Sequence, residues 1–395
     1  MTIDGARRKA NVPVTIFCLF SSVLISLIAM AMVPALTGVA KEVGKGDDGA
    51  LTAQLIMTIP SIFMIIGASL TGYLSERIGR RAVAILCLVL YSISGASGLL
   101  LGSLTALMVS RIILGLVGGA LLTIGYVTIG EYFDGVRREW MLGLISAFAS
   151  FSSVLVLWFG GDFVESFGWR APFAVYLLGF VMVPFAFLGM HKDLPLAMPK
   201  TKQGWVPVLR YWPFFALVAA YTIGMYMPSA QGPFLLAERG ETSPALIGKI
   251  IAVSSLVSAV GAFFYGAMRK WLNFSGMFTY ISAALGIGMI TAVMSDTTEQ
   301  FIIACGIMGL ALGVIESTVA SEVLARAPEQ LHDRAIGLSI AALFFGQFLN
   351  PWVAKPFRDA GGADFAFQAI GGCFLIAMVV FAISWVRTRR TQPSS

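Results

Sequence analysis

The sequence predicts an all-α membrane protein with twelve transmembrane helices, and three observations lead to this class. Hydrophobic residues make up 57% of the 395-residue chain and charged residues only 12%, about half the charged share of a soluble domain. Uninterrupted apolar runs recur along the whole chain, each near the ~20 residues with which a helix crosses a bilayer. Only helices and closed barrels satisfy the backbone in lipid, and these runs lack the alternation of barrel strands.

The apolar runs form two groups of six, separated by a polar segment. The first six lie near residues 12–38, 50–74, 82–102, 104–130, 140–163 and 171–190. The second six lie near residues 211–236, 245–267, 273–294, 300–324, 334–357 and 365–387. We therefore expect an N-terminal six-helix bundle over residues 1–190, a linker over 191–210 and a C-terminal six-helix bundle over 211–395. The first run is far longer than the apolar core of a signal peptide, so it is predicted to be a membrane helix.

Lys and Arg are distributed unevenly between the predicted loops. Most of the 27 fall in the N-terminal segment, the 191–210 linker, the C-terminal tail and alternate loops, such as the loop that holds Arg80 and Arg81. Cytoplasmic loops of membrane proteins are enriched in Lys and Arg. Both termini and the linker are therefore predicted to be cytoplasmic, in a multi-pass protein of a bacterial inner membrane.

The two halves repeat one another at a constant shift of 194 residues. Gly115 falls on Gly309 and Gly119 on Gly313 under this shift, and Pro34, Gly72 and Phe173 also fall on matching residues. Six spans return the chain to its starting side, so the halves have parallel topology. Transporters built from two parallel repeats relate them by an axis along the membrane normal, and we expect that pseudo-two-fold arrangement here.

Composition and motifs exclude several classes of function. The net charge of +6 is spread between apolar runs and forms no nucleic-acid patch. The four cysteines lie inside apolar runs and are predicted to be small hydrophobic residues, so we expect no metal site and no cofactor. No phosphate-binding loop and no Ser/His/Asp or Cys/His constellation points to an enzyme. The expected partners are a small-molecule substrate, protons and lipid, and the protein is expected to be a monomer.

The loop after the second run carries a family motif. Residues 72–81 read Gly-Tyr-Leu-Ser-Glu-Arg-Ile-Gly-Arg-Arg, which resembles the G-x-L-x-D-R-x-G-R-R signature of the major facilitator superfamily, with Glu76 in place of the usual Asp. Arg111 followed by Gly115, Gly118 and Gly119 is similar to a second motif of that superfamily. The resemblance covers the whole chain and implies the major facilitator fold and transport by alternating access.

The resemblance also implies a conformational latch at this loop. Its acid, here Glu76, would cap the start of the eleventh span near Asp333 and Arg334, where the helix dipole favours negative charge. Arg80 is expected to pair with Glu131 at the end of the fourth span. The predicted latch comprises Gly72, Glu76, Arg77, Gly79, Arg80, Arg81 and Glu131.

Two charged residues are predicted inside spans. Glu316 lies about two-thirds of the way through the tenth span, where a charge that faces lipid costs a few kcal/mol. It is expected to carry the coupling proton or to bind substrate, the alternative being a structural hydrogen-bonding acid. Arg111 is predicted either to bind an anionic group in a cavity or to be held by backbone carbonyls that brace neighbouring spans.

Polar and aromatic residues within the spans are candidates to line a central cavity, with hydrogen bonding between helices as the alternative. The candidates are Tyr126, Tyr221, Tyr226, Gln231, Ser254, Ser258, Gln347 and Asn350. Asp162 and Glu165 are expected at the periplasmic end of the fifth span, near Arg170.

Three functions are weighed. The first is a secondary transporter that exports a small amphipathic or aromatic solute in exchange for protons through Glu316. The second is a symporter or facilitator for a small organic acid or sugar. The third, a membrane enzyme or receptor, finds no support among the motifs, and the protein is expected not to be an enzyme.

Overall fold

The computed structural model describes residues 10–43, 48–191, 210–326 and 332–391, and all regular elements in these ranges are helices. The prediction of an all-helical membrane protein is confirmed. Ten helices in this part of the chain are long and apolar enough to cross a membrane. Six of the twelve predicted runs coincide with one helix each, with ends displaced by a few residues.

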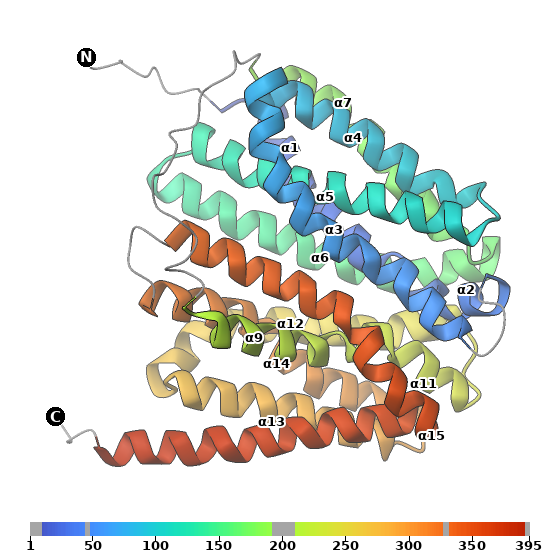
Figure 1. Cartoon of the computed structure of the whole chain (residues 1–395), viewed down its shortest axis with the longest axis vertical. Coiled ribbons are helices and arrows are strands. Elements are labelled where there is room, and N and C mark those ends of the chain that lie inside the picture. Colours follow the sequence, from blue (N-terminus) through green and yellow to red (C-terminus); the bar gives the residue numbers. More distant parts are fainter. Residues whose placement is uncertain (1–9, 44–47, 192–209, 327–331, 392–395) are drawn as a thin grey trace.

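The helices before residue 192 are called the N-terminal helices. They are α1 (Val12–Met30), η1 (Val33–Ala35), α2 (Leu36–Glu42), α3 (Gly49–Ile78), α4 (Arg80–Ala96), η2 (Ser97–Leu99), α5 (Leu104–Tyr132), α6 (Gly135–Phe167), η3 (Ala171–Leu177) and α7 (Leu178–Gly189). Figure 1 shows them in the upper part of the molecule.

The helices after residue 209 are called the C-terminal helices. They are α9 (Trp212–Met225), α10 (Met227–Ala230), α11 (Gly232–Glu238), α12 (Pro244–Trp271), α13 (Phe274–Val293), α14 (Thr298–Arg326) and α15 (His332–Thr391). They fill the lower part of Figure 1.

Three of the predicted runs, at 211–236, 334–357 and 365–387, depart most clearly from single helices. The run at 211–236 is divided into α9, α10 and α11, because Pro228 and Pro233 lack the backbone N–H that would continue a helix. The last two runs are joined in α15, whose helical geometry is interrupted at Gly361 and Gly362. Gly362 has a φ of +74°, which favours glycine, and Figure 1 shows two arms that meet at an angle.

Glycines let pairs of long helices pack backbone against backbone. A Cβ on Gly119 would lie 2.0 Å from the Met64 carbonyl oxygen, at the α3–α5 contact. A Cβ on Gly313 would lie 1.9 Å from the Ser258 carbonyl oxygen, at the α12–α14 contact. Both pairs are related by the 194-residue shift, so the sequence repeat is accompanied by repeated helix packing.

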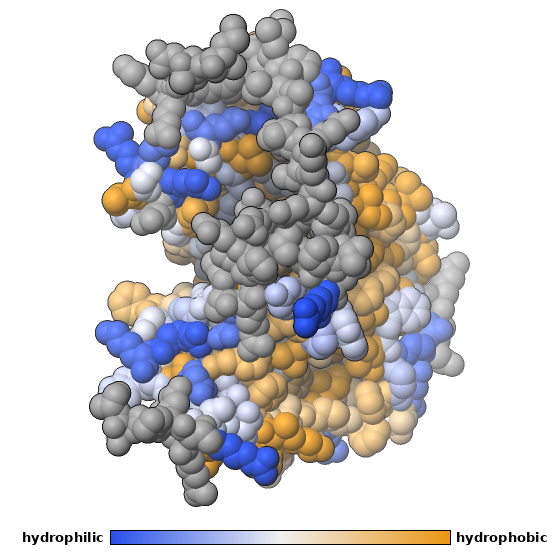
Figure 2. All heavy atoms as spheres, turned by 60° about the vertical axis from the view of Figure 1, so that its left-hand side comes forward, coloured by the Kyte–Doolittle hydropathy of each residue, from blue (hydrophilic) through white to orange (hydrophobic). Residues whose placement is uncertain are grey.

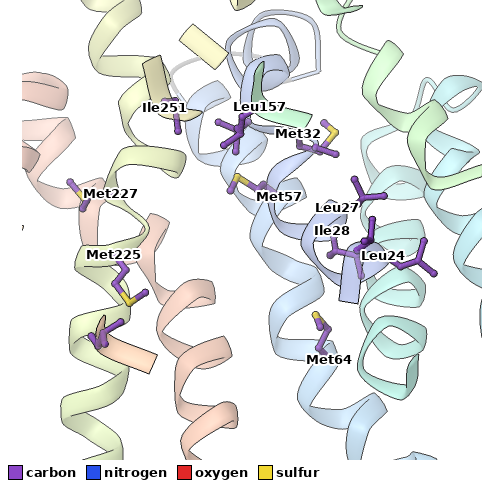
Figure 3. Packing of buried hydrophobic residues seen from close by; sticks show 14 of the residues in the cluster. Leu24, Leu27, Ile28, Met32, Met57, Met64, Leu157, Met225, Met227 and Ile251 are labelled. Atoms are coloured by element: carbon purple, nitrogen blue, oxygen red, sulfur yellow. The ribbon is translucent and has the colours of Figure 1, made fainter. Parts of the chain in front are cut away.

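Large apolar side chains fill the interior between the helices. Figure 3 shows part of this core, with Leu24, Ile28 and Met64 among the N-terminal helices and Met225 and Met227 on α9 and α10. Leu157 of α6 and Ile251 of α12 are fully buried where the two groups of helices meet. This packing holds the long helices that carry the polar residues described below.

The two groups of helices meet mainly through α6 with α12 and α3 with α15. One end of the molecule, where α2 ends and α3 begins, takes part in these contacts. The same end holds the α6–η3 and α11–α12 turns, and we call it the closed end. The opposite side, where α1 begins and α15 ends, we call the open end (Figure 1). Figure 2 turns that side forward and shows a hollow between the upper and lower parts.

Candidate functional site: a central cavity around Glu316

Three adjoining cavities of about 310, 340 and 340 Å³ lie between the N-terminal and C-terminal helices. Glu316 of α14 and Tyr226, between α9 and α10, line all three. We therefore treat the three as one space, the central cavity. Its walls come from α1, α3, α5 and α6 on one side and from α9, α10, α12, α14 and α15 on the other.

Glu316 projects into this cavity from the part of α14 nearer the open end. It lies 18 residues after Thr298, about 27 Å along the helix at 1.5 Å per residue, and its side chain is exposed within the cavity. Among the described residues that line the cavity, it is the sole Asp, Glu, Lys, Arg or His. Among its described lining residues the cavity therefore holds one carboxyl group and no basic side chain.

Four of the eight predicted lining residues are found on the cavity walls. Tyr126, Tyr226 and Gln347 line the space around Glu316, and Ser258 lines the cavity beside α12. Tyr126 is 46% exposed although it lies within a long apolar helix. Two tyrosine rings and one amide thus share the cavity with the carboxyl group.

The expectation is corrected for Tyr221 and Ser254, which the structure places away from the cavity. The Tyr221 hydroxyl is hydrogen-bonded to Ser282, and its ring packs edge-on against Phe278 and Phe374. Ser254 is buried and donates to the Ile251 carbonyl oxygen of its own helix. Both residues serve helix packing, the alternative that the sequence left open.

Gln231 and Asn350 are also fully buried and belong to a different feature, a polar network toward the closed end. Gln54 of α3 donates to the Gln231 side-chain oxygen at 2.7 Å and to the Ala230 carbonyl at 3.0 Å. Gln231 in turn donates to Asn350 at 3.3 Å and accepts from Arg358 at 3.2 Å. Because Gln54 belongs to the N-terminal helices and the others to the C-terminal helices, this network joins the two groups.

Arg111 lies outside the cavity, which corrects the expectation that it binds an anion there. Its side chain is 1% exposed and donates to the carbonyl oxygens of Ser94 at 3.1 Å and Gly95 at 2.9 Å, at the end of α4. The guanidinium also lies over the rings of Phe173 and Tyr176, at 4.9 and 5.2 Å. Arg111 therefore braces α4, α5 and η3, consistent with the second alternative.

Serines on α1 and α6 line the cavity and were missed by the sequence reasoning. They are Ser22, Ser26, Ser146, Ser150 and Ser153. Their spacings of four and of four and three residues place each set on one face of a helix. The regular spacing of these serines on otherwise apolar helices could have indicated a face that lines a cavity. It was not interpreted so, because a single Ser in a span usually bonds its own backbone.

Charged contacts at the closed end also link the two groups of helices. Lys249 of α12 pairs with Asp162 of α6 at 3.0 Å, and Lys355 of α15 pairs with Asp48 at 2.6 Å. Glu165 accepts from Ser243 and from the Ala245 backbone N–H. Asp162 and Glu165 thus face α12 and the turn before it. From the sequence they had been expected near Arg170. Exposed ion pairs contribute about 0–1 kcal/mol each, so several such contacts together hold this end closed.

A family comparison agrees with this geometry. Residues 18–351 match the model of the major facilitator superfamily over most of the chain. The chain belongs to the major facilitator superfamily. Membership in this superfamily indicates a membrane transporter.

Known superfamily members give further likeness at low identity. The chain is 25% identical over 195 residues to the multidrug transporter protein MdtP of Bacillus subtilis, covering 48% of this chain and 35% of that one. It is 28% identical over 214 residues to the multidrug resistance protein MdtM of Escherichia coli, covering 48% of this chain and 50% of that one. The chain thus spans half or less of the length of these two relatives. A solved D-xylose–proton symporter has the same fold, with a TM-score of 0.76 and 14% identity over 93% of this chain and 96% of that one.

The superfamily motif forms the α3–α4 turn at the open end. Gly79 separates the two helices with a φ of +83°, a conformation that strains other residues. Arg80 forms an ion pair with Glu131 at the end of α5, which confirms the predicted contact. The turn is thereby tied to α5 within the N-terminal helices.

Two further residues of the predicted latch contact aromatic rings of the N-terminal helices. Arg77 lies over the Tyr73 ring at 4.4 Å and Arg81 over the Phe187 ring at 4.0 Å. Glu76 is exposed, and a Cβ on Gly72 would meet no atom within 4 Å. The expected partners of Glu76, the side chains of Asp333 and Arg334, lie outside the described residues.

Proposed function

We propose that this chain is a secondary active transporter that moves a small organic solute out of the cell in exchange for protons. Glu316 carries the proposal, because it is the one ionisable carboxyl group among the described lining residues of a cavity between two groups of helices. An ionisable side chain that faces an interior cavity of a membrane protein, and not lipid, can serve in a proton pathway. A side chain in that position can release its proton to one side and take up another from the other side.

We further propose twelve membrane crossings with the N-terminal and C-terminal helices as two bundles related by a pseudo-two-fold axis. The segment α9–α11 would cross once despite its breaks, and α15 would cross twice because it turns back at Gly361 and Gly362. The matched glycine contacts at Gly119 and Gly313 support the repeat. The bundles would comprise residues 1–190 and 211–395, joined by the 191–210 linker.

In this proposal the open end faces the cytoplasm and the closed end faces outward, so the structure represents an inward-open state. Lys and Arg in the loops at the open end support this orientation. Transport would require the Gln54–Gln231 bond and the ion pairs of the closed end to break while the open end closes. The two bundles would rock about the central cavity, as in other transporters built from repeats.

The direction of proton movement tests this function. Purified protein is screened by thermal shift against cationic, anionic and neutral solutes, and each ligand found is added to proteoliposomes that contain a pH dye. Antiport of solute for protons makes the lumen more alkaline as solute enters, whereas symport makes it more acidic. Acidification of the lumen on addition of solute would contradict antiport and support the symporter alternative. Transport without any pH change would contradict proton coupling.

The proposed orientation makes a labelling prediction. In a variant with Cys373→Ser, a cysteine at Thr297, between α13 and α14, should react with a membrane-impermeant maleimide in intact cells. A cysteine at Asn273, between α12 and α13, should react only after the membrane is permeabilised. The opposite pattern at these two positions would reverse the orientation.

The ion pair at the superfamily motif makes a second prediction. Arg80→Ala removes the contact with Glu131 that positions the α3–α4 turn, so the transport rate should fall several-fold while the affinity for solute stays within a few-fold. Lys at position 80 keeps the charge and should restore part of the rate. Equal rates for Arg80→Ala and the unmodified protein would show that the motif does not take part in gating.

A further inference from the structure

The described residues that line the central cavity can provide a negative charge but no positive one. Glu316 provides a negative charge when ionised, and no Lys, Arg or His is among the described lining residues. An anionic solute would meet the carboxylate with no compensating cation among these described residues, and like charges that face each other repel. The electrostatics therefore favour a cation.

The hydroxyl groups of the walls add a second constraint, because several of them already donate to their own helices. Ser22 donates to the carbonyl oxygens of Leu19 and Ile145 at 2.8 Å, and Ser153 donates to Ala149 at 2.9 Å. The same pattern holds for Ser26, Thr222 and Ser339. A hydroxyl has one hydrogen and two lone pairs, so a Ser that donates backwards offers the cavity acceptors only.

The opposite wall supplies further acceptors. The ionised carboxylate of Glu316 accepts through two oxygens and donates nothing. Tyr126 and Tyr226 add aromatic surface beside it. Tyr126, Tyr226 and Gln347 can donate as well as accept, whereas the carboxylate and the back-donating serines only accept. A solute with several N–H donors would satisfy these acceptors.

From this arrangement we infer that the solute is a protonated primary or secondary amine, or a guanidinium compound, of a size that fits the 310–340 Å³ cavities. One N–H binds the Glu316 carboxylate, and the remaining N–H groups bind the serine acceptors of α1 and α6. A quaternary ammonium ion has the same charge but no N–H, so it leaves these acceptors without donors. The inference rests on the proposed transport function and names its substrate class.

The test compares solutes that share one organic frame. Binding to the purified full chain is measured at one pH for tyramine, its N,N,N-trimethyl derivative and 3-(4-hydroxyphenyl)propionate, and for matched sets built on 2-phenylethylguanidine and cyclohexylmethylamine. In at least one set the N–H-bearing cation should bind about tenfold or more tightly than its N-methylated counterpart, and the anions should not bind. Equal or tighter binding of the quaternary ions, preference for the anions, or no binding by any N–H-bearing cation would overturn the inference.

Variants separate the contribution of the Glu316 carboxylate to binding from that of the cavity serines on α1 and α6. Glu316→Gln should weaken binding of the best amine about tenfold or more, whereas Glu299→Gln, an exposed acid on the same helix, should not change it. Ser146→Ala combined with Ser153→Ala should weaken the amine more than its quaternary derivative. If binding of the amine and of its quaternary derivative is weakened by the same factor, the serines do not accept hydrogen bonds from N–H groups, and that part of the inference fails.

The outcomes also distinguish this inference from the proposed function. Glu316-dependent amine binding without solute movement in proteoliposomes under any gradient would retain the binding site and overturn the transport proposal. Gradient-driven transport of an anion or a neutral sugar, with no amine binding, would retain transport and overturn the substrate class.

Discussion

Glu316→Gln should abolish solute movement driven by a pH gradient, reducing it to the level of liposomes without protein. Gln has nearly the shape of Glu and keeps hydrogen-bonding capacity, but it cannot bind and release a proton. Because no other Asp, Glu, Lys, Arg or His is found among the described lining residues, no neighbour can replace it. The measurement is solute flux in proteoliposomes with an imposed pH gradient, for the unmodified protein, Glu316→Gln and the control Glu299→Gln.

The same site predicts how transport responds to membrane potential. If one carboxylate alternately holds one proton and one monovalent cation, each cycle exchanges one positive charge for another. A potential set by valinomycin and K⁺ should then leave the flux unchanged, while a pH gradient drives it. Strong stimulation by potential alone, or normal gradient-driven flux in Glu316→Gln, would contradict Glu316 as the single exchanging group.

Gly161→Ala should shift the protein away from the state described here. A Cβ at this position would lie 2.2 Å from the Pro244 carbonyl oxygen and 2.5 Å from the Ala245 Cα, where α6 meets α12 at the closed end. Both neighbours are backbone atoms, so the helices must separate. Such overpacking costs about 1–3 kcal/mol, which changes the ratio of two states by about 5- to 150-fold.

Spin labels on cysteines at Ser166 and Thr242, on either side of the closed end, measure this shift in a Cys373→Ser background. The distance between the labels should increase in Gly161→Ala, and transport should slow because the state closed at this end becomes costly. Gly160→Ala is the matched control, since its Cβ would make only an ordinary contact of 3.6 Å with Pro34. Identical distance distributions in the two variants would show that close packing at Gly161 does not hold this end closed.

Local sequence patterns were sufficient for the helices and for one residue of the site. Long apolar runs required helices because lipid offers no partner for backbone groups, and the break between the last two runs falls at Gly361 and Gly362 as their spacing indicated. Glu316 was recognisable because an acid within a span is costly unless it faces an interior space. Arg80 and Glu131 were paired from motif and position alone.

Which polar residues line the cavity was decided only by the tertiary structure. Tyr221 and Tyr226 lie on neighbouring turns, yet Tyr221 is buried against Phe278 while Tyr226 lines the cavity together with Glu316. Arg111 was equally consistent with a cavity or a brace until the α4 carbonyls were seen within hydrogen-bonding distance.

The sequence by itself therefore determined the helices and the acid at position 316, since these depend on hydrophobicity and charge along one chain. Only the tertiary structure revealed the cavity serines on α1 and α6, the Gln54–Gln231 hydrogen bond and the contacts of the closed end. Each of these joins segments that are far apart in the chain, and the direction of a polar side chain on an apolar helix depends on what packs against it.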